Sequence, residues 1–169
     1  ANLDKAAGFT FLSPETYRGA GQFMFNLPCV PGEKAEVKGD AKTRFDITGS
    51  KFYQQYHEVD VLLENANKEL RDYEASLNQR IKNGETQQTI MAEYEQKAPA
   101  LQKAKDDKIF DFVKLHPDYE ACATIIEQFD DVSKMEKLLG LLSENVKNGR
   151  MKAFYQPMID MAKKRAEAE

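Results

Sequence analysis

The spacing of hydrophobic residues along the chain changes near Gly49 and Ser50. Before this point, short aromatic and aliphatic runs are separated by glycine and proline, a pattern typical of β-strands and turns. After it, apolar residues recur in steps of three and four, as along a helix with one narrow buried face. The pattern predicts an α+β fold that is mostly α, with a small β region in residues 1–49 and a helical domain in residues 50–169.

The β region is expected to contain short strands at residues 9–12 and 23–27, followed by a hairpin with arms at residues 35–38 and 43–48 and its bend near Gly39 and Asp40. Between these parts, Pro31 and Gly32 suit a type II turn, because proline presets φ and glycine accepts a positive φ. A sheet this small is marginal alone, so we expect other elements to cover it.

The first helix is predicted from a cap at Ser50 to about Lys82, where Asn83 and Gly84 suit a left-handed end. A 3.5-residue repeat keeps one seam on one side of this helix. The seam consists of Phe52, Tyr56, Val59, Leu63, Ala66, Leu70, Tyr73 and Leu77.

A second helix is expected from about Glu85 to Leu115, with Pro99 kinking or breaking it near Ala98. The short connection between the two helices predicts a long antiparallel hairpin. The seam can then be satisfied within the hairpin or between two chains. The core candidates of the second helix are Ile90, Tyr94, Ala98, Leu101, Phe112 and Leu115.

Short helices are expected after the hairpin. Asp118 suits the N-cap of a helix over residues 119–129, Ser133 and Glu136 match a capping box for the next, and the last begins at about Met151. In the first of these helices, Cys122, Ile125, Ile126 and Phe129 are expected to face inward. The next helix carries Met135, Leu138, Leu139, Leu141 and Leu142, and the last runs through Phe154, Met158, Ile159 and Ala162.

Charge and length narrow the possible partners. The 169-residue chain has a net charge of −4, and no basic patch of the kind that neutralises phosphates, so nucleic acid is not an expected partner. No apolar stretch approaches the roughly 20 residues needed to cross a bilayer, so a membrane span is not expected. The first residues lack a signal-peptide pattern, although this says little about location, since a trimmed chain would have lost it.

No set of residues predicts a catalytic site, a bound cofactor or a metal. Cys122 lies among apolar neighbours, which favours an inert buried thiol, and a disulfide between Cys29 and Cys122 stays open. His57 has no ligand partner at helical spacing, so a solvated or loosely packed side chain is favoured. His116 precedes a proline at a helix end, which is a structural position.

Two groups of side chains have alternative interpretations. Met151, Met158 and Met161 on the last helix, with Phe154, form either an adaptable binding face or core filling, and core filling is favoured. The tyrosines along the hairpin are partner anchors or half-buried core edges, and the second is favoured. They are Tyr53, Tyr56, Tyr73 and Tyr94.

Several motifs together resemble the N-terminal region of bacterial envelope thioredoxin-like proteins, the TlpA/ResA-type thiol-disulfide oxidoreductases of Bacteroidetes. They are Val-Pro-Gly-Glu at residues 30–33, Val37-x-Gly39, Ile-Thr-Gly-Ser at residues 47–50 and Phe-Val-Lys-Leu-His-Pro-Asp at residues 112–118. In that family a small β domain of unknown function and a helical segment precede the thioredoxin domain. The resemblance covers roughly residues 23–169.

The resemblance implies an accessory module, often of a lipoprotein, in the cell envelope or periplasm. Its expected partner is a C-terminal thioredoxin-like domain, which it would position or dimerise, and helical surfaces could form a homodimer. The chain has no C-x-x-C motif, so no catalytic residue carries over, and it is either an excised portion or a relative without the redox domain. The rivals are a stand-alone helical adaptor and an enzyme acting through Cys122 or Cys29.

Overall fold

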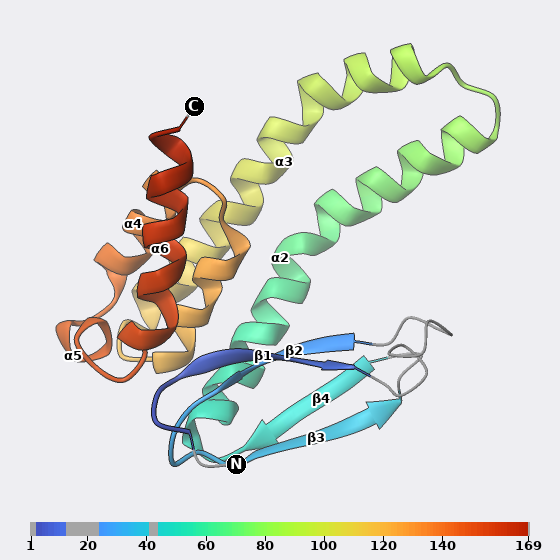
Figure 1. The fold of residues 1–169 in the computed structure, drawn as a ribbon. Helices are drawn as coiled ribbons and strands as arrows, with labels where there is room; N and C mark the ends of the chain where they lie inside the picture. The colour runs from blue at the N-terminus through green and yellow to red at the C-terminus, as the bar shows by residue number, and fades with distance from the viewer. Residues whose placement is uncertain (1–2, 13–23, 41–43, 169) are drawn as a thin grey trace. The chain divides into compact units, whose positions relative to one another are not determined.

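The computed structural model describes residues 3–12, 24–40 and 44–168 (Figure 1). Four strands come first in these ranges, and helices follow to the C-terminal end. The predicted mostly α fold with a small N-terminal β region is therefore confirmed.

The strands form two separate antiparallel pairs. β1 (Ala7–Leu12) pairs with β2 (Met24–Cys29), and β3 (Ala35–Asp40) pairs with β4 (Arg44–Gly49). The residues adjoining these strands at 23 and 43 lie outside the described ranges. Gly39 and Asp40, where the bend was expected, belong to β3, and residues 41–43 after them lie outside the described ranges.

The predicted type II turn is confirmed between the two pairs. The amide of Glu33 donates to the carbonyl of Val30 at 3.2 Å, which closes a four-residue turn. Gly32 has a φ of 78°, the value that the third position of this turn requires. Pro31 and Gly32 therefore occupy the positions that their backbone preferences predict.

The two long helices are α2 (Lys51–Lys82) and α3 (Gln87–Leu115). The predicted end of α2 is confirmed: Gly84 has a φ of 98°, its amide donates to Ile81, and the Glu85 amide donates to Arg80. These two bonds define a Schellman motif. α3 begins two residues later than predicted, after Thr86, whose Oγ1 accepts from the amide of Thr89 at 3.4 Å.

Pro99 does not break α3, contrary to one of the two expected outcomes. Proline removes one backbone hydrogen bond, and the remaining bonds of a 29-residue helix hold it together. The seam predicted on α2 lies inward: Phe52, Val59, Ala66 and Leu77 are buried. The other seam residues, namely Tyr56, Leu63, Leu70 and Tyr73, are half-buried.

The chain divides into two compact units, one of residues 1–59 with 116–169 and one of residues 60–115. The second unit comprises residues 60–82 of α2, the connection and α3. Here the rings of Tyr73 and Tyr94 stack with centroids 6.3 Å apart, and Lys108 pairs with Glu69 at 3.0 Å. Tyr73 of the seam therefore contacts the facing helix within this unit. The predicted boundary between residues 49 and 50 stays a prediction.

The core of α3 differs in part from the prediction. Ile90 and Ala98 are buried as expected, whereas Leu115 is 77% exposed. The buried stripe near the end of the helix instead runs through Asp106, Ile109, Phe110 and Val113. This stripe keeps the three-and-four spacing of a helix face. It includes the charged residue Asp106, so a pattern of hydrophobic residues alone did not predict it.

In the first unit, a 3₁₀ helix η1 (Glu120–Gln128) is followed by α4 (Val132–Leu141), α5 (Glu144–Lys147) and α6 (Lys152–Ala166). All six residues from Ala121 to Ile126 are buried, whereas Glu127 and Gln128 at the end of η1 are exposed. Cys122, Ile125, Ile126 and Phe129 are buried as predicted. In the following helices Met135, Leu138, Leu142, Phe154, Ile159 and Ala162 are buried, while Leu139, Leu141 and Met158 are half-buried.

Two caps predicted for the short helices are wrong. Asp118 is exposed, and the N-cap of η1 is Tyr119, which makes no side-chain cap bond. Ser133 lies inside α4, whose cap is Asp131: its Oδ1 accepts from the amide of Ser133 at 2.7 Å. Glu136 consequently pairs with Lys163 of α6 instead of closing a capping box. The preceding aspartate was available as a cap because it comes before the helix begins.

Candidate interaction sites

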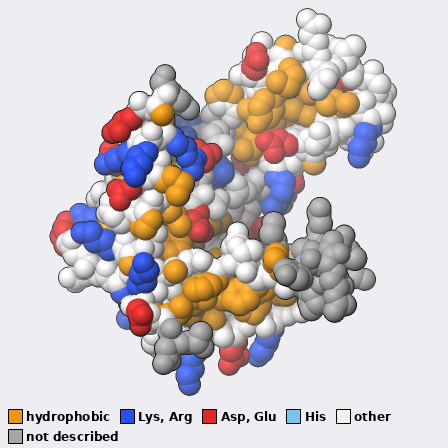
Figure 2. Space-filling model, in the orientation of Figure 1, with side chains coloured by type: hydrophobic (Ala, Val, Ile, Leu, Met, Phe, Trp, Pro, Cys, Tyr) orange, Lys and Arg blue, Asp and Glu red, His pale blue; other side chains and the backbone are white. Residues whose placement is uncertain are grey.

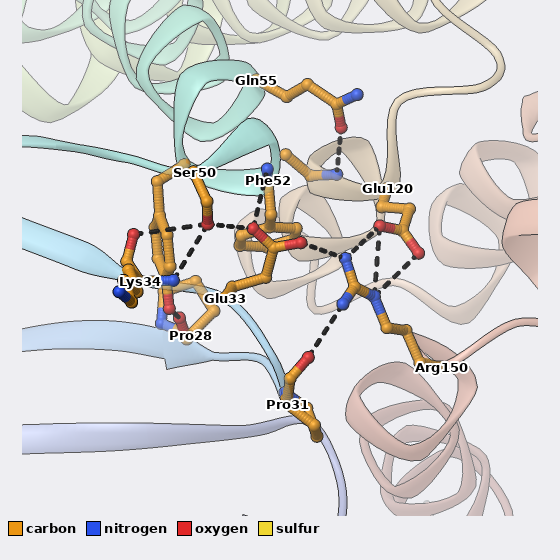
Figure 3. A network of polar contacts seen from close by, with 11 residues as sticks. Pro28, Pro31, Glu33, Lys34, Ser50, Phe52, Gln55, Glu120 and Arg150 are labelled. Atoms are coloured by element: carbon orange, nitrogen blue, oxygen red, sulfur yellow. Dashed lines mark hydrogen bonds and ion pairs between the residues drawn. The ribbon is translucent and has the colours of Figure 1, made fainter.

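Arg150, just before α6, is the centre of a polar network in the first unit (Figure 3). Its guanidinium lies 2.6 Å from Glu33 and 2.7 Å from Glu120, and it donates to the carbonyl of Pro31 at 2.9 Å. The network joins the turn after β2 to η1 and to the start of α6. The sequence did not single out these residues, because 117 positions separate Arg150 from Glu33 and no periodic pattern links them.

Glu33 also caps the first turn of α2 by accepting a hydrogen bond from a backbone amide, a role that was predicted for Ser50. The carboxylate accepts from the amide of Phe52 at 3.3 Å, while the Ser50 hydroxyl donates to Glu33 and accepts from the amide of Lys34. The cap at Ser50 is therefore corrected: the residue precedes the helix, but the carboxylate of Glu33 supplies the acceptor. A negative charge suits the positive end of the helix dipole.

Burial alone would raise the pKa of Glu33, but hydrogen bonds from Ser50, Arg150 and the Phe52 amide outweigh it and lower that pKa. The same pairing, chiefly the hydrogen bonds to Glu120, raises the pKa of Arg150. Both side chains thus stay charged, and their ion pairs connect the turn after β2 to η1 and to the start of α6. Such mutually satisfied charges are typical of a structural ion-pair network.

The two cysteines are free thiols, so the disulfide left open by the sequence is not formed. Cys122 is fully buried, and burial raises its pKa to about 12. Burial also raises the pKa of Cys29. Since the thiolate is the reactive form, both environments disfavour nucleophilic chemistry near neutral pH.

The histidines lie apart. Nδ1 of His57 is 3.1 Å from Oδ1 of Asp46, and the ring of His116 stacks on Tyr119 at 4.4 Å. Within residues 3–12, 24–40 and 44–168, no group of three or more His, Cys, Asp or Glu side chains is placed to hold a metal. No helix in these ranges has the length and apolar character that a membrane span requires.

The second unit carries an open groove between α2 and α3 near the end of the hairpin, with a volume of about 370 Å³. Buried Leu77 and Ile90 belong to its lining, and Ile81 and Met91, which are 39% and 49% exposed, lie at its surface. Figure 2 shows hydrophobic side chains gathered on this part of the hairpin. Large apolar side chains left open to solvent in one patch are typical of protein–protein contacts.

Polar side chains flank this groove on α2. Glu74 and Asn78 line it, and the hydroxyl of Tyr94 donates to Glu74 at 3.1 Å. The tyrosines of the hairpin are half-buried as favoured, except Tyr53, which is buried and donates to the carbonyl of Pro28 at 2.8 Å. The sequence did not predict the groove, because its shape depends on how side chains of α2 and α3 pack against each other.

The chain was compared with known proteins in three ways. It matches no protein-family model, no curated protein and no solved structure. The likeness to the accessory region of envelope thioredoxin-like proteins therefore stays a prediction from short motifs.

Proposed function

We propose that the chain is a non-catalytic interaction module that pairs with a second copy of itself through the groove at the end of its helical hairpin. The observation that carries the proposal is a self-complementary column of side chains beside this groove. The column consists of Glu74, Asn78 and Lys82, which are four residues apart on α2. Residues at this spacing lie above one another on the same helix face.

A two-fold axis at Asn78 would place two copies of α2 antiparallel to each other. Glu74 then faces Lys82 of the second copy, and the same pair forms again on the other side of the axis. Lys82 is exposed and has no carboxylate partner within the described parts of the chain, while Glu74 accepts only the Tyr94 hydroxyl there. Both charges are thus available for a contact between copies.

The apolar side chains support the same arrangement. Ile81 and Met91 line the groove and are exposed. Each side chain would insert between side chains of the second copy, as in knobs-into-holes packing. Two hairpins packed in this way form a four-helix bundle at their ends. Burying the exposed parts of these side chains contributes roughly 1 kcal/mol for each, by area.

In the parent protein, the paired hairpins would hold two attached domains at a fixed separation. The resemblance of residues 30–33, 47–50 and 112–118 to envelope proteins of the TlpA/ResA type supports a C-terminal thioredoxin-like domain as the domain positioned, in the cell envelope or periplasm. The alternative is a stand-alone helical adaptor, which uses the same contact without a redox partner. The sequence that follows Glu169 in the gene distinguishes them: a domain with C-x-x-C supports the first, and a stop codon supports the second.

Sedimentation equilibrium of charge-reversed variants tests the pairing. Glu74→Lys and Lys82→Glu each place like charges opposite one another and should weaken association, whereas the double variant rebuilds both pairs and should restore it. The matched control reverses Lys68 and Asp72, an ion pair on another side of α2, and should leave association unchanged. A wild-type protein that stays monomeric over a wide range of concentrations would reject the proposal, as would single reversals without effect.

A further inference from the structure

We propose that the first unit carries a separate binding site, a methionine-lined groove that takes a peptide segment combining a basic side chain with an aliphatic one. The groove has a volume of about 420 Å³. Its apolar lining includes Ile126 of η1, Met135 of α4, and Met158 and Met161 of α6. It is independent of the hairpin groove, whose residues all belong to the second unit.

The methionines differ in exposure in a way that suits a binding surface. Met151 is fully buried and fills the core, as favoured from the sequence, whereas Met158 is half-buried and Met161 is 54% exposed. A thioether side chain is flexible and polarizable, so it can adapt to aliphatic groups of different shape. The ion pair between Lys163 and Glu136, at 2.8 Å, joins α6 to α4 beside these residues.

Two carboxylates give the groove its charge preference. Glu127 and Asp130 both line it, and neither has a cationic or hydrogen-bonding partner within the described ranges. The Glu127 carboxylate also lies close to β1, since a Cβ placed on Gly8 would be 3.9 Å from its Oε1. Glu127 is exposed at the groove, and partial desolvation by its neighbours raises its pKa. An ammonium or guanidinium group from a ligand would compensate this charge.

Arg165 supplies a donor in the same groove. Its Nη2 lies 3.3 Å from Sδ of Met161, and no carboxylate pairs with it within the described ranges. The guanidinium can therefore donate to a backbone carbonyl of an extended peptide. Two carboxylates against one guanidinium disfavour an acidic peptide, and the apolar lining favours aliphatic side chains beside the basic one. The occupant most complementary to these groups is a basic, aliphatic peptide segment.

Methyl NMR of the full chain labelled with ¹³C at the methionine methyl groups tests this site. The probe is the acetylated amide of Leu-Lys-Leu-Lys, and its matched control replaces both lysines with glutamate. The lysine peptide should shift the signals of Met135, Met158 and Met161 saturably and leave Met91 and Met151 unchanged. The glutamate peptide should bind at least about fivefold more weakly than the lysine peptide.

Variants distinguish specific binding in this groove from non-specific binding elsewhere on the surface. Glu127→Gln should reduce the affinity for the lysine peptide by about fivefold, and Glu167→Gln, an exposed carboxylate at the end of α6, should not change it. Equal binding of the two peptides, no saturable shift, or shifts of Met91 as large as those of Met158 would overturn the proposal. None of these outcomes depends on the state of association of the hairpin.

Discussion

The guanidinium of Arg150 lies 2.6 Å from the carboxylate of Glu33, although 117 residues separate them in the chain. The Glu33 side chain is only 12% exposed, and that of Arg150 is 34% exposed, so water screens this pair less than a surface pair. The pair links the turn after β2 to the start of α6. It is thus one of the contacts that bring the two ends of the first unit together.

Removing either member of this pair should destabilise the protein. We expect Arg150→Gln to lower the free energy of unfolding by about 2 kcal/mol, because a partly buried carboxylate loses its charged donor. Glu33→Gln should have a similar effect, and the double variant should lose less than the sum of the two. Chemical denaturation measures all three. Arg165→Gln is the control, and its stability should stay within about 0.5 kcal/mol of wild type.

The contribution of Glu33 should depend on pH. Its pKa in the folded protein is lowered from the ordinary value of 4.5, so the unfolded chain binds its proton more readily. The resulting stability is fully present above the unfolded value and is lost as the pH falls through the folded value. Denaturation at pH 7 and at pH 3 should therefore show the gap between wild type and Glu33→Gln shrinking at the lower pH. A gap that widens there would contradict this assignment.

Gly49, at the end of β4, should not tolerate a side chain. Its φ is 146°, and an added Cβ would lie 1.9 Å from the backbone oxygen of Lys34. Gly49→Ala should therefore cost about 3 kcal/mol or more, because the backbone must move. Gly84→Ala is the comparison: its φ of 98° is also strained, but an added Cβ meets no neighbour within 4 Å. We expect it to cost only about 1 to 2 kcal/mol. Thermal and chemical denaturation measure the stability lost in each variant. A larger loss for Gly84→Ala than for Gly49→Ala would contradict the close approach at Gly49.

Cys122 should resist alkylation. Its pKa is raised to about 12 and its side chain is fully buried, so little thiolate is available near neutral pH. Iodoacetamide at pH 8 should label it in the native protein at a rate set by unfolding, and much faster in denaturant. Mass spectrometry of the labelled peptides measures both rates. Rapid labelling of native Cys122 would revive the interpretation of the chain as a thiol enzyme.

The sequence predicted the elements that local chemistry determines. The turn at Pro31 and Gly32 and the helix end at Gly84 follow from backbone preferences, and the seam of α2 follows from spacing. Two of the errors arose where another side chain could supply the same cap. Asp131 caps α4 in place of Ser133, and the carboxylate of Glu33 serves α2 in place of the Ser50 hydroxyl.

The candidate sites were less predictable, since they depend on tertiary packing. Arg150 and Glu33 meet only after the chain has folded, and no pattern in the sequence pairs them. The methionines of α6 carried a partial signal, because Met158 and Met161 were recognised as either core or binding face. What the sequence lacked was the position of Glu127 beside them, which depends on how η1 packs against α6.

Oxidative cross-linking at Asn78 tests the pairing of hairpins most directly. A residue on a two-fold axis meets its own equivalent, so Asn78→Cys should form a disulfide between two copies in high yield. Ser76→Cys is the matched control, because Ser76 is exposed and lies roughly 200° around the same helix from Asn78. It should form no more cross-linked dimer than the wild-type protein, which has only its native cysteines. The account predicts an efficient dimer band for Asn78→Cys alone. Equal yields for the two variants, or a monomer in both, would contradict it.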